Sequence, residues 1–187
     1  MVEETSESAK SLKSTPYTAE GAKVLYDDWV GSYDETLKAW GYPAPRRIAE
    51  TLTAMGYGEK TAVKVLDLGC GTGLSGEAIK AAKIGSNGIV GVDISPKSIE
   101  LLGKDKPGLY SEAYASSIDE KLTFCKDSDF DVVICVGTMS YIENFPLFYS
   151  EVLRVSKPGA VFAFTQNTVQ WDENYRGIKV EADKITE

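Results

Sequence analysis

A short apolar segment that ends in three alternating glycines restricts the fold of this chain more than any other feature. Residues 65–73 read VLDLGCGTG and lead directly into a stretch with helical periodicity. Glycines allow the backbone to turn sharply and to approach a ligand closely at the carboxyl end of a strand, which is where open α/β sheets bind ligands. The segment therefore predicts a buried strand, a ligand-binding loop and a helix, in that order. A purely structural turn is the alternative.

A carboxylate follows the next predicted strand at a spacing that suits nucleoside binding. Residues 89–93 read IVGVD, and Asp93 comes about 20 residues after the last glycine, as the acid of a ribose site does. An acid at this place can accept the hydrogens of both ribose hydroxyls. Alternatively, the negative charge of Asp93 would stabilise the N-terminus of the helix that follows Ser95.

The spacing of the glycines distinguishes two classes of nucleotide cofactor. Dinucleotide sites use G-x-G-x-x-G, whose third glycine allows close helix packing beneath a pyrophosphate. Here Gly69, Gly71 and Gly73 alternate, and Asp67 precedes the first of them by two residues. A carboxylate so close to the loop would repel a pyrophosphate and attract a cationic ligand. The spacing thus favours a nucleoside with ammonium and sulfonium charges, and an NAD-dependent oxidoreductase is the weaker alternative.

The remainder of the chain alternates between short apolar runs and helical stretches, as chains built from βαβ units do. The pattern predicts strands at 62–68, 88–93, 109–115, 131–136 and 160–165, and helices near 73–82, 96–102 and 145–155. Upstream, apolar residues at steps of three and four between Val24 and Leu37 predict one helix, and a second is expected at 45–55. Right-handed crossovers would give a parallel sheet that helices cover on both faces.

The composition excludes several kinds of chemistry and partner. The sequence contains no histidine, so the usual general base and the Ser–His and Cys–His nucleophile pairs are missing, and we expect no metal site. The net charge of −8, from 20 Lys and Arg against 28 Asp and Glu, is the wrong sign for phosphate neutralisation, so we expect no nucleic-acid partner. Three cysteines without a C-x-x-C pair, an acidic N-terminus and the lack of a long apolar run predict a cytoplasmic protein that does not associate with membranes.

Four motifs follow one another between about residues 63 and 165. They read DLGCGTG from Asp67, GVDISP from Gly91, FDVVICVG from Phe130 and LRVSKPG from Leu153. In this order they resemble the successive motifs of class I S-adenosylmethionine-dependent methyltransferases. The upstream stretch 26–45 resembles the corresponding part of the Williams-Beuren-region methyltransferase-like group.

The resemblance implies a Rossmann-like, doubly wound, mostly parallel sheet in the order 3-2-1-4-5 with N-terminal lid helices. Relatives usually close this sheet with a sixth and a seventh strand, but few residues follow Thr165, so we expect these strands to be absent or incomplete. The fifth strand would then be an exposed edge, which a homodimer is one way to cover. We divide the chain into a flexible tail at 1–17 and a single methyltransferase-like domain at 18–187, with N-terminal helices at 18–60, a cofactor-binding core at 61–167 and a truncated C-terminal segment at 168–187.

The resemblance also implies S-adenosyl-L-methionine as cofactor, S-adenosyl-L-homocysteine as product, and roles for individual residues. Around the cofactor these are Gly69, Cys70, Gly71 and Gly73 in the loop, Asp67 near the methionine amino group, Asp93 at the ribose, Ile94 on the adenine, Ser117 and Ile118 where many relatives carry an adenine-binding acid, and Cys135, Val136 and Gly137 opposite the loop. Tyr26 and Tyr33 would belong to the lid, for which core packing is an equal alternative. Thr138, Ser140 and Tyr141 would face the acceptor. Cys70 and Cys135 have the alternative of being small buried hydrophobes.

The functional hypothesis is direct in-line transfer of a methyl group to a small-molecule acceptor. Such a reaction depends on alignment and on exclusion of water more than on a nucleophile of the protein. Tyr141 and Asp34 are the candidates for catalytic assistance. The alternatives are a cofactor-binding protein without catalysis and a truncated form that needs a partner, and the serine at position 117 and the short C-terminal segment are the reasons for keeping them.

Overall fold

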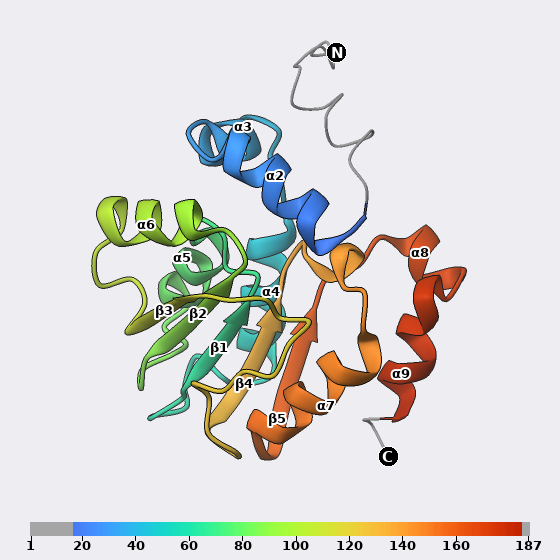
Figure 1. Ribbon diagram of the computed structural model, residues 1–187. Helices are drawn as coiled ribbons and strands as arrows, with labels where there is room; N and C mark the ends of the chain where they lie inside the picture. The colour runs from blue at the N-terminus through green and yellow to red at the C-terminus, as the bar shows by residue number, and fades with distance from the viewer. Residues whose placement is uncertain (1–16, 185–187) are drawn as a thin grey trace.

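The computed structural model describes residues 17–184, so the tail predicted at 1–17 lies, apart from Tyr17, outside the described residues. One sheet contains β1 (Val65–Leu68), β2 (Ile89–Asp93), β3 (Glu112–Ala115), β4 (Phe130–Cys135) and β5 (Ser156–Phe164). Its order is β3-β2-β1-β4-β5, and all neighbouring strands are parallel (Figure 1). The predicted Rossmann-like sheet and its strand order are confirmed.

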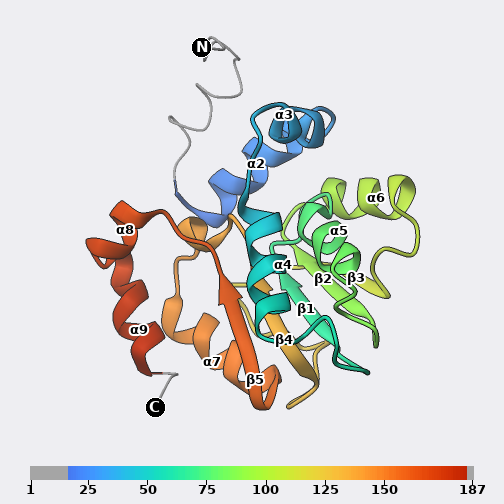
Figure 2. The same cartoon turned by 180° about the vertical axis from the view of Figure 1, so that it is seen from behind.

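Helices surround this sheet on three sides. They are α2 (Ala19–Trp29), α3 (Tyr33–Ala39), α4 (Ala44–Ala54), α5 (Leu74–Ala81), α6 (Pro96–Asp105), α7 (Phe145–Val155), α8 (Thr168–Asp172) and α9 (Ile178–Lys184), with short 3-10 turns η1 (Met139–Tyr141) and η2 (Tyr175–Gly177). Figures 1 and 2 show α2 and α3 above the carboxyl ends of the strands, α4 and α5 on one face of the sheet, and α7 and α9 beside the other. Within the described residues no helix is long and apolar enough to cross a membrane.

Two cores form because alternate side chains of each strand point to opposite faces. Val65, Ile89 and Val132 belong to the core beneath α4 and α5. Leu66 and Val90, one residue further along, belong to the core beneath α7 and α9. Both faces of the central strands are therefore buried, which explains why these strands read as continuous apolar runs.

The N-terminal region differs from the prediction of one helix that includes Val24 to Leu37. The chain instead forms α2 and α3, which are separated by a turn at residues 30–32. Gly31 is a poor helix former, and Ser32, at φ −126° and ψ 4°, is the N-cap residue of α3. Val24, which the periodicity placed on the buried face, is 54% exposed.

Helices, not strands, follow β5 in the part of the chain that the structure describes. Between residues 165 and 184 the structure has α8, η2 and α9, and β5 pairs only with β4. Ile178 and Ala182 of α9 join the core beneath α7, and the hydroxyl of Tyr149 donates to the carbonyl of Ile178 at 3.3 Å. The segment covers α7, and β5 is the edge of the described sheet, as the sequence predicted.

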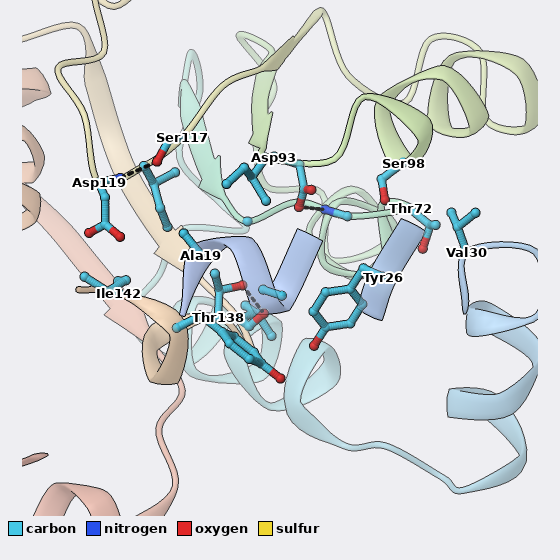
Figure 3. Close-up of a pocket in the computed structure, with 18 of the residues that line it drawn as sticks. Ala19, Tyr26, Val30, Thr72, Asp93, Ser98, Ser117, Asp119, Thr138 and Ile142 are labelled. Atoms are coloured by element: carbon cyan, nitrogen blue, oxygen red, sulfur yellow. Dashed lines mark hydrogen bonds between the residues drawn. The ribbon is translucent and has the colours of Figure 1, made fainter. Parts of the chain in front are cut away.

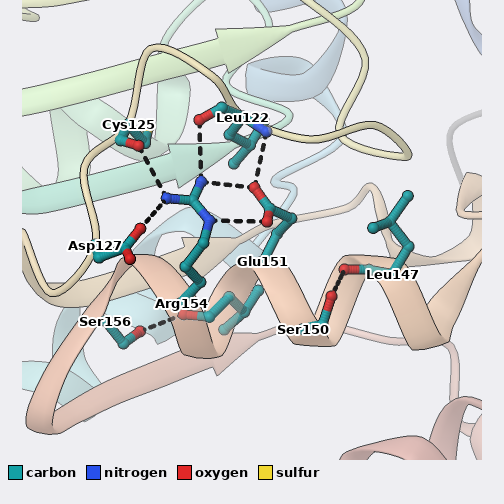
Figure 4. A network of polar contacts seen from close by, with 9 residues as sticks. Leu122, Cys125, Asp127, Leu147, Ser150, Glu151, Arg154 and Ser156 are labelled. Atoms are coloured by element: carbon teal, nitrogen blue, oxygen red, sulfur yellow. Dashed lines mark hydrogen bonds and ion pairs between the residues drawn. The ribbon is translucent and has the colours of Figure 1, made fainter.

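Arg154 of α7 holds the loop that leads into β4 (Figure 4). Its guanidinium pairs with Glu151 at 2.6 Å and with Asp127 at 2.7 Å, and it donates to the carbonyls of Leu122 and Cys125 at 3.0 Å. The hydrogen bonds from Arg154 hold the pKa of Glu151 below its usual value. This network ties the β3–β4 connection to the body of the domain, and the beginning of that connection forms part of the cavity described next.

Candidate functional site

A cavity lies between the carboxyl ends of the central strands and the N-terminal helices (Figure 3), at the point where the strand order reverses. It encloses about 770 Å³ of empty space, which includes solvent-open space at its mouth. The structure brings most of the predicted site residues together here. Those that line it are Tyr26, Tyr33, Gly69, Gly71, Asp93, Ile94, Ser117, Ile118, Val136, Gly137, Thr138 and Tyr141.

The glycine loop approaches the segment after β4 very closely at Gly69. This residue has a φ of +78°, and a Cβ built on it would lie 2.2 Å from Oγ1 of Thr138. A side chain would therefore both strain the backbone and collide with Thr138. At Gly71, by contrast, an added Cβ would meet nothing within 4 Å, so open space lies in front of the loop at this point.

Asp93 connects the end of β2 to the glycine loop. Its Oδ2 accepts from the backbone N–H of Gly71 at 2.8 Å, and its Oδ1 accepts from the N–H of Ser95 at 2.9 Å. Burial raises the pKa of the Asp93 carboxyl, and the two backbone hydrogen bonds oppose that rise. Each carboxylate oxygen retains lone-pair capacity, so the same group is placed to hold the loop, to begin α6 and to accept from a ligand in the cavity.

The N-terminal helices cover the cavity with aromatic side chains. The ring of Tyr26 lies 5.5 Å from that of Tyr33 and 6.0 Å from that of Tyr141, centre to centre. Two carboxylates fasten these helices: Asp27 of α2 accepts from the hydroxyl of Ser95, and Asp34 of α3 accepts from the hydroxyl of Thr72. The lid predicted from the resemblance thus has defined attachments to the loops beneath it.

Asp34 does not line the cavity. Its carboxylate pairs with Lys106 at 2.7 Å in addition to its bond with Thr72. These contacts join α3 to the end of α6 and to the glycine loop. The position therefore assigns Asp34 to fastening the lid and gives no support to its predicted catalytic assistance.

Asp67 lies under the glycine loop and is fully buried, not exposed to the cavity. Its Oδ2 accepts from the hydroxyls of Ser75 and Tyr110, each at 2.6 Å, while its Oδ1 has no hydrogen-bond partner among residues 17–184. Burial raises the pKa of this carboxyl to about 6, although the two hydroxyls oppose the rise. Because Asp67 shares the sheet face of Val65, strand alternation turns it towards α5 and away from the predicted methionine contact.

Four further predicted residues lie outside this cavity. Cys70 lines a smaller neighbouring pocket beside Tyr33, Gly73 precedes α5, Cys135 is fully buried in β4, and Ser140 lines a separate groove beside Tyr42. Burial raises the pKa values of both thiols well above the ordinary value. Their positions agree with the alternative that these cysteines act as small buried hydrophobes.

Replacing Asp67 by asparagine is expected to change the pH dependence of stability. The folded state keeps the proton of Asp67 up to about pH 6, whereas the unfolded chain loses it near its ordinary pKa of about 4. The folded state thus binds more protons between these values, and the contribution of Asp67 to stability falls as pH rises through this window. As pH rises from 4 to 7, the unfolding free energy of the asparagine variant should increase by up to roughly 3 kcal/mol relative to that of the natural chain. Urea unfolding measures this difference.

Glu151→Gln is the matched control, because the lowered pKa of Glu151 gives the opposite sign. Its carboxylate contributes stability that is present at neutral pH and is lost as pH falls through the folded-state pKa. If the unfolding free energies of the natural chain and the Asp67→Asn variant change with pH in parallel, the pKa of Asp67 is not raised in the folded state.

Several cavity residues were not predicted from the sequence, and Asp119 is the most informative. It lies two residues after Ser117, whose hydroxyl accepts from the Asp119 backbone N–H at 3.1 Å. Its carboxylate accepts from the N–H groups of Glu143 and Asn144. Many relatives carry an acid at the position of Ser117. A search for an acid two residues further along the sequence would have found Asp119. The others are Ala19, Ala22, Val30, Thr72, Ser98 and Ile142.

The charge and shape of the cavity fit a cationic nucleoside. Among the described residues, those lining it include Asp93 and Asp119 and neither lysine nor arginine, which favours a positively charged ligand. Ile94 and Ile118 offer apolar surface for a flat ring, and the tyrosine rings offer faces for a cation. These residues and the open space in front of Gly71 suit S-adenosyl-L-methionine, and Asp67 does not line the cavity.

Comparisons with known proteins agree with this architecture. Residues 59–184 match a protein family described as "Methyltransferase domain". Methyltransferase-like protein 27 of Homo sapiens is 29% identical over 162 residues, which cover 86% of this chain and 64% of that protein. A sterol 24-C-methyltransferase of Gibberella zeae is 30% identical over 153 residues, which cover 75% of this chain and 38% of the other. The chain thus spans less than two thirds of the length of either relative.

Solved structures show the same fold. A putative S-adenosyl-L-methionine-dependent methyltransferase from Methanococcus maripaludis superposes with a TM-score of 0.64 at 18% identity and covers 91% of this chain and 85% of its own. A putative methyltransferase of Haloferax volcanii, solved in complex with a methyltransferase activator, has a TM-score of 0.63 at 18% identity, with 81% of this chain and 66% of that chain covered.

Proposed function

Because the chain belongs to the family of class I S-adenosylmethionine-dependent methyltransferases, we propose that it transfers a methyl group from S-adenosyl-L-methionine to a small-molecule acceptor. The observation that carries the proposal is the lidded cavity in which Asp93 and the glycine loop meet. When bound, the cofactor would supply a methyl group activated by its sulfonium charge. The protein would supply the binding site, the alignment and the exclusion of water.

Each side of the cavity would have a separate task. Asp93 would accept from the ribose hydroxyls while its bonds to Gly71 and Ser95 keep it in place. Ile94 and Ile118 would enclose the base. Tyr26 and Tyr33 of the lid would keep water from the reacting atoms and turn aromatic faces to a cation.

Tyr141 would act as a hydrogen-bond donor on the acceptor side. Burial raises the pKa of its hydroxyl above the ordinary tyrosine value, so the phenol stays protonated at neutral pH and is unsuited to be a base. With no histidine in the sequence, an acceptor that readily loses its proton to water, such as a phenol, acid, thiol or amine, suits this site best. Its nucleophilic atom would supply the electron pair of the new bond to the methyl carbon, while the sulfur–methyl bond breaks and its electron pair stays on the sulfur of the S-adenosyl-L-homocysteine that leaves.

Two features favour a small acceptor. The helices α2 and α3 lie over the carboxyl ends of the strands (Figure 1), and Tyr26 and Tyr33 of these helices line the cavity. One curated relative is named for methylation of a sterol, and others are named for ubiquinone biosynthesis. For this chain a small molecule is an inference from the covered site.

Isothermal titration calorimetry with S-adenosyl-L-methionine and S-adenosyl-L-homocysteine tests the proposal first. We expect saturable binding of both compounds at one site, and formation of S-adenosyl-L-homocysteine when a suitable acceptor is present. Absence of heat at high micromolar ligand, with a circular dichroism spectrum that shows folded protein, would refute the proposed function.

A second candidate is a cofactor-binding protein that needs a partner for turnover. Within residues 17–184, β5 is an edge strand, and an unpaired edge is a ready site for another strand. A second copy of the chain would cover it in a homodimer. Cofactor binding without turnover by the isolated chain, together with a dimer or complex in light scattering, would favour this candidate.

A further inference from the structure

A second hollow adjoins the cofactor cavity at the carboxyl end of β4. This groove, whose empty space of about 1020 Å³ includes open solvent, lies between the start of α4 and the segment that follows β5. Gly137 lines both the groove and the cavity. A Cβ built on Gly137 would lie 2.8 Å from the hydroxyl oxygen of Tyr42. Glycine at this position therefore leaves space between the two hollows that a side chain would fill.

Arg47 is the charged residue that lines the groove among those the structure describes. In residues 17–184 its guanidinium has neither a hydrogen-bond nor an ion-pair partner, whereas the neighbouring Arg46 pairs with Glu50 at 2.5 Å. Arg47 also lies in the first turn of α4, where the helix dipole disfavours a cation. Its charge therefore serves neither the helix nor a salt bridge, and it remains available to a ligand.

The two adjoining hollows carry opposite charges. Among the residues that the structure describes, Asp93 and Asp119 line the cavity without a basic residue, and Arg47 lines the groove without an acidic one. No described carboxylate lines the groove, although the chain has a net charge of −8. Local charge of this kind selects the sign of the bound group.

The other walls of the groove suit a compact, partly apolar molecule. Tyr42 and Phe164 contribute ring surface, and Gln166 and Asn167 contribute neutral amides. The amide nitrogen of Gln166 and the hydroxyl of Ser140 both donate to the Gln170 side chain, at 2.8 and 2.6 Å. This pairing fixes the polar wall opposite α4.

We propose that the groove binds the methyl acceptor and that this acceptor is a small carboxylate, whose anionic group pairs with Arg47 while its nucleophilic atom lies towards Gly137. The planar guanidinium matches a carboxylate with two parallel hydrogen bonds. This inference rests on the proposed function, because it names the acceptor class of the same site.

Ligand-observed NMR titrations of the protein saturated with S-adenosyl-L-homocysteine test it. The probes are two matched pairs, para-hydroxybenzoate with para-hydroxybenzamide and hydrocinnamate with its amide, which differ in charge at nearly constant shape. We expect each carboxylate to bind roughly tenfold more tightly than its amide, and Arg47→Ala to abolish this preference. Arg47→Lys should keep part of it, because the charge remains without the planar fork.

Arg46→Ala is the matched control, since this arginine lies one residue away, is exposed and lines neither hollow. It should leave the carboxylate preference unchanged. Equal binding of acid and amide, failure of both carboxylates to bind, or an unchanged preference in Arg47→Ala would overturn the inference. If S-adenosyl-L-homocysteine binds normally in these experiments, only the acceptor class is wrong; if it does not bind, the proposed function itself fails.

Discussion

Replacing Asp93 by alanine is expected to weaken the binding of S-adenosyl-L-homocysteine by about 100-fold or more. The carboxylate is the proposed acceptor for two ribose hydroxyls, and hydrogen bonds to a charged group contribute about 1.5–3 kcal/mol each. The substitution also removes the acceptor of the Gly71 and Ser95 N–H groups, at 2.8 and 2.9 Å, so the loop loses its attachment to β2. Calorimetric titration of the purified variant measures the effect.

Two other variants make this result specific. Asp93→Asn retains one carbonyl acceptor and should lose less affinity than Asp93→Ala. Asp131→Asn is the matched control at the opposite end of the sheet, where Asp131 accepts from the N–H of Lys64 at 2.9 Å and pairs with Lys157 at 2.8 Å. It should affect stability and leave ligand affinity unchanged. Equal affinities for the natural chain and Asp93→Ala would contradict the ribose role.

Replacing Gly69 by alanine is expected to cost about 2–4 kcal/mol of unfolding free energy and to lower cofactor affinity at least tenfold. The backbone at φ +78° is strained for any residue with a Cβ, and that atom would lie 2.2 Å from Oγ1 of Thr138. Either the loop or the segment after β4 must then move, and both line the cavity. Urea unfolding and calorimetry measure the two losses.

Gly108→Ala separates backbone strain from collision. Gly108 has a φ of +74°, but its added Cβ would meet nothing within 4 Å, so this variant should lose only about 1–2 kcal/mol. Combining Gly69→Ala with Thr138→Gly removes the colliding atoms and should recover part of the stability. If Gly69→Ala and Gly108→Ala lose the same stability, the close approach to Thr138 has no energetic importance.

The strands were predictable because each is an apolar run bounded by turn residues, but their ends were not. The third was predicted at 109–115, whereas β3 begins at Glu112 because Tyr110 instead reaches under the glycine loop to Asp67. The fifth was predicted at 160–165, whereas β5 begins at Ser156, where a register irregularity lets it pair with Phe130. Contacts between distant segments decided both boundaries.

The site residues likewise fall into two groups, those that a local sequence signal indicates and those that only contacts between distant segments bring together. Glycine spacing and a carboxylate at the end of a strand are local signals, and the residues they indicated, Gly69, Gly71 and Asp93, all line the cavity. Asp34 with Thr72, and Arg47 with Gln166, come from segments far apart in the chain. Neither pair is marked by a periodicity or a motif in the segments that contain its residues. The sequence therefore did not predict the attachment of the lid or the groove.

The sequence by itself determined the order of the strands and of the helices between them, the edge of the sheet at which the cavity lies and the acid that follows β2, because hydrophobic period and turn chemistry act over a few residues. Only the tertiary structure decided which carboxylates reach the cavity. Asp67 is turned under the loop by the alternation of β1 and by its bonds to Ser75 and Tyr110, while Asp119 is brought to the cavity by the anchored β3–β4 connection. Such placements are sums of many weak contacts between remote segments, which no short stretch of sequence contains.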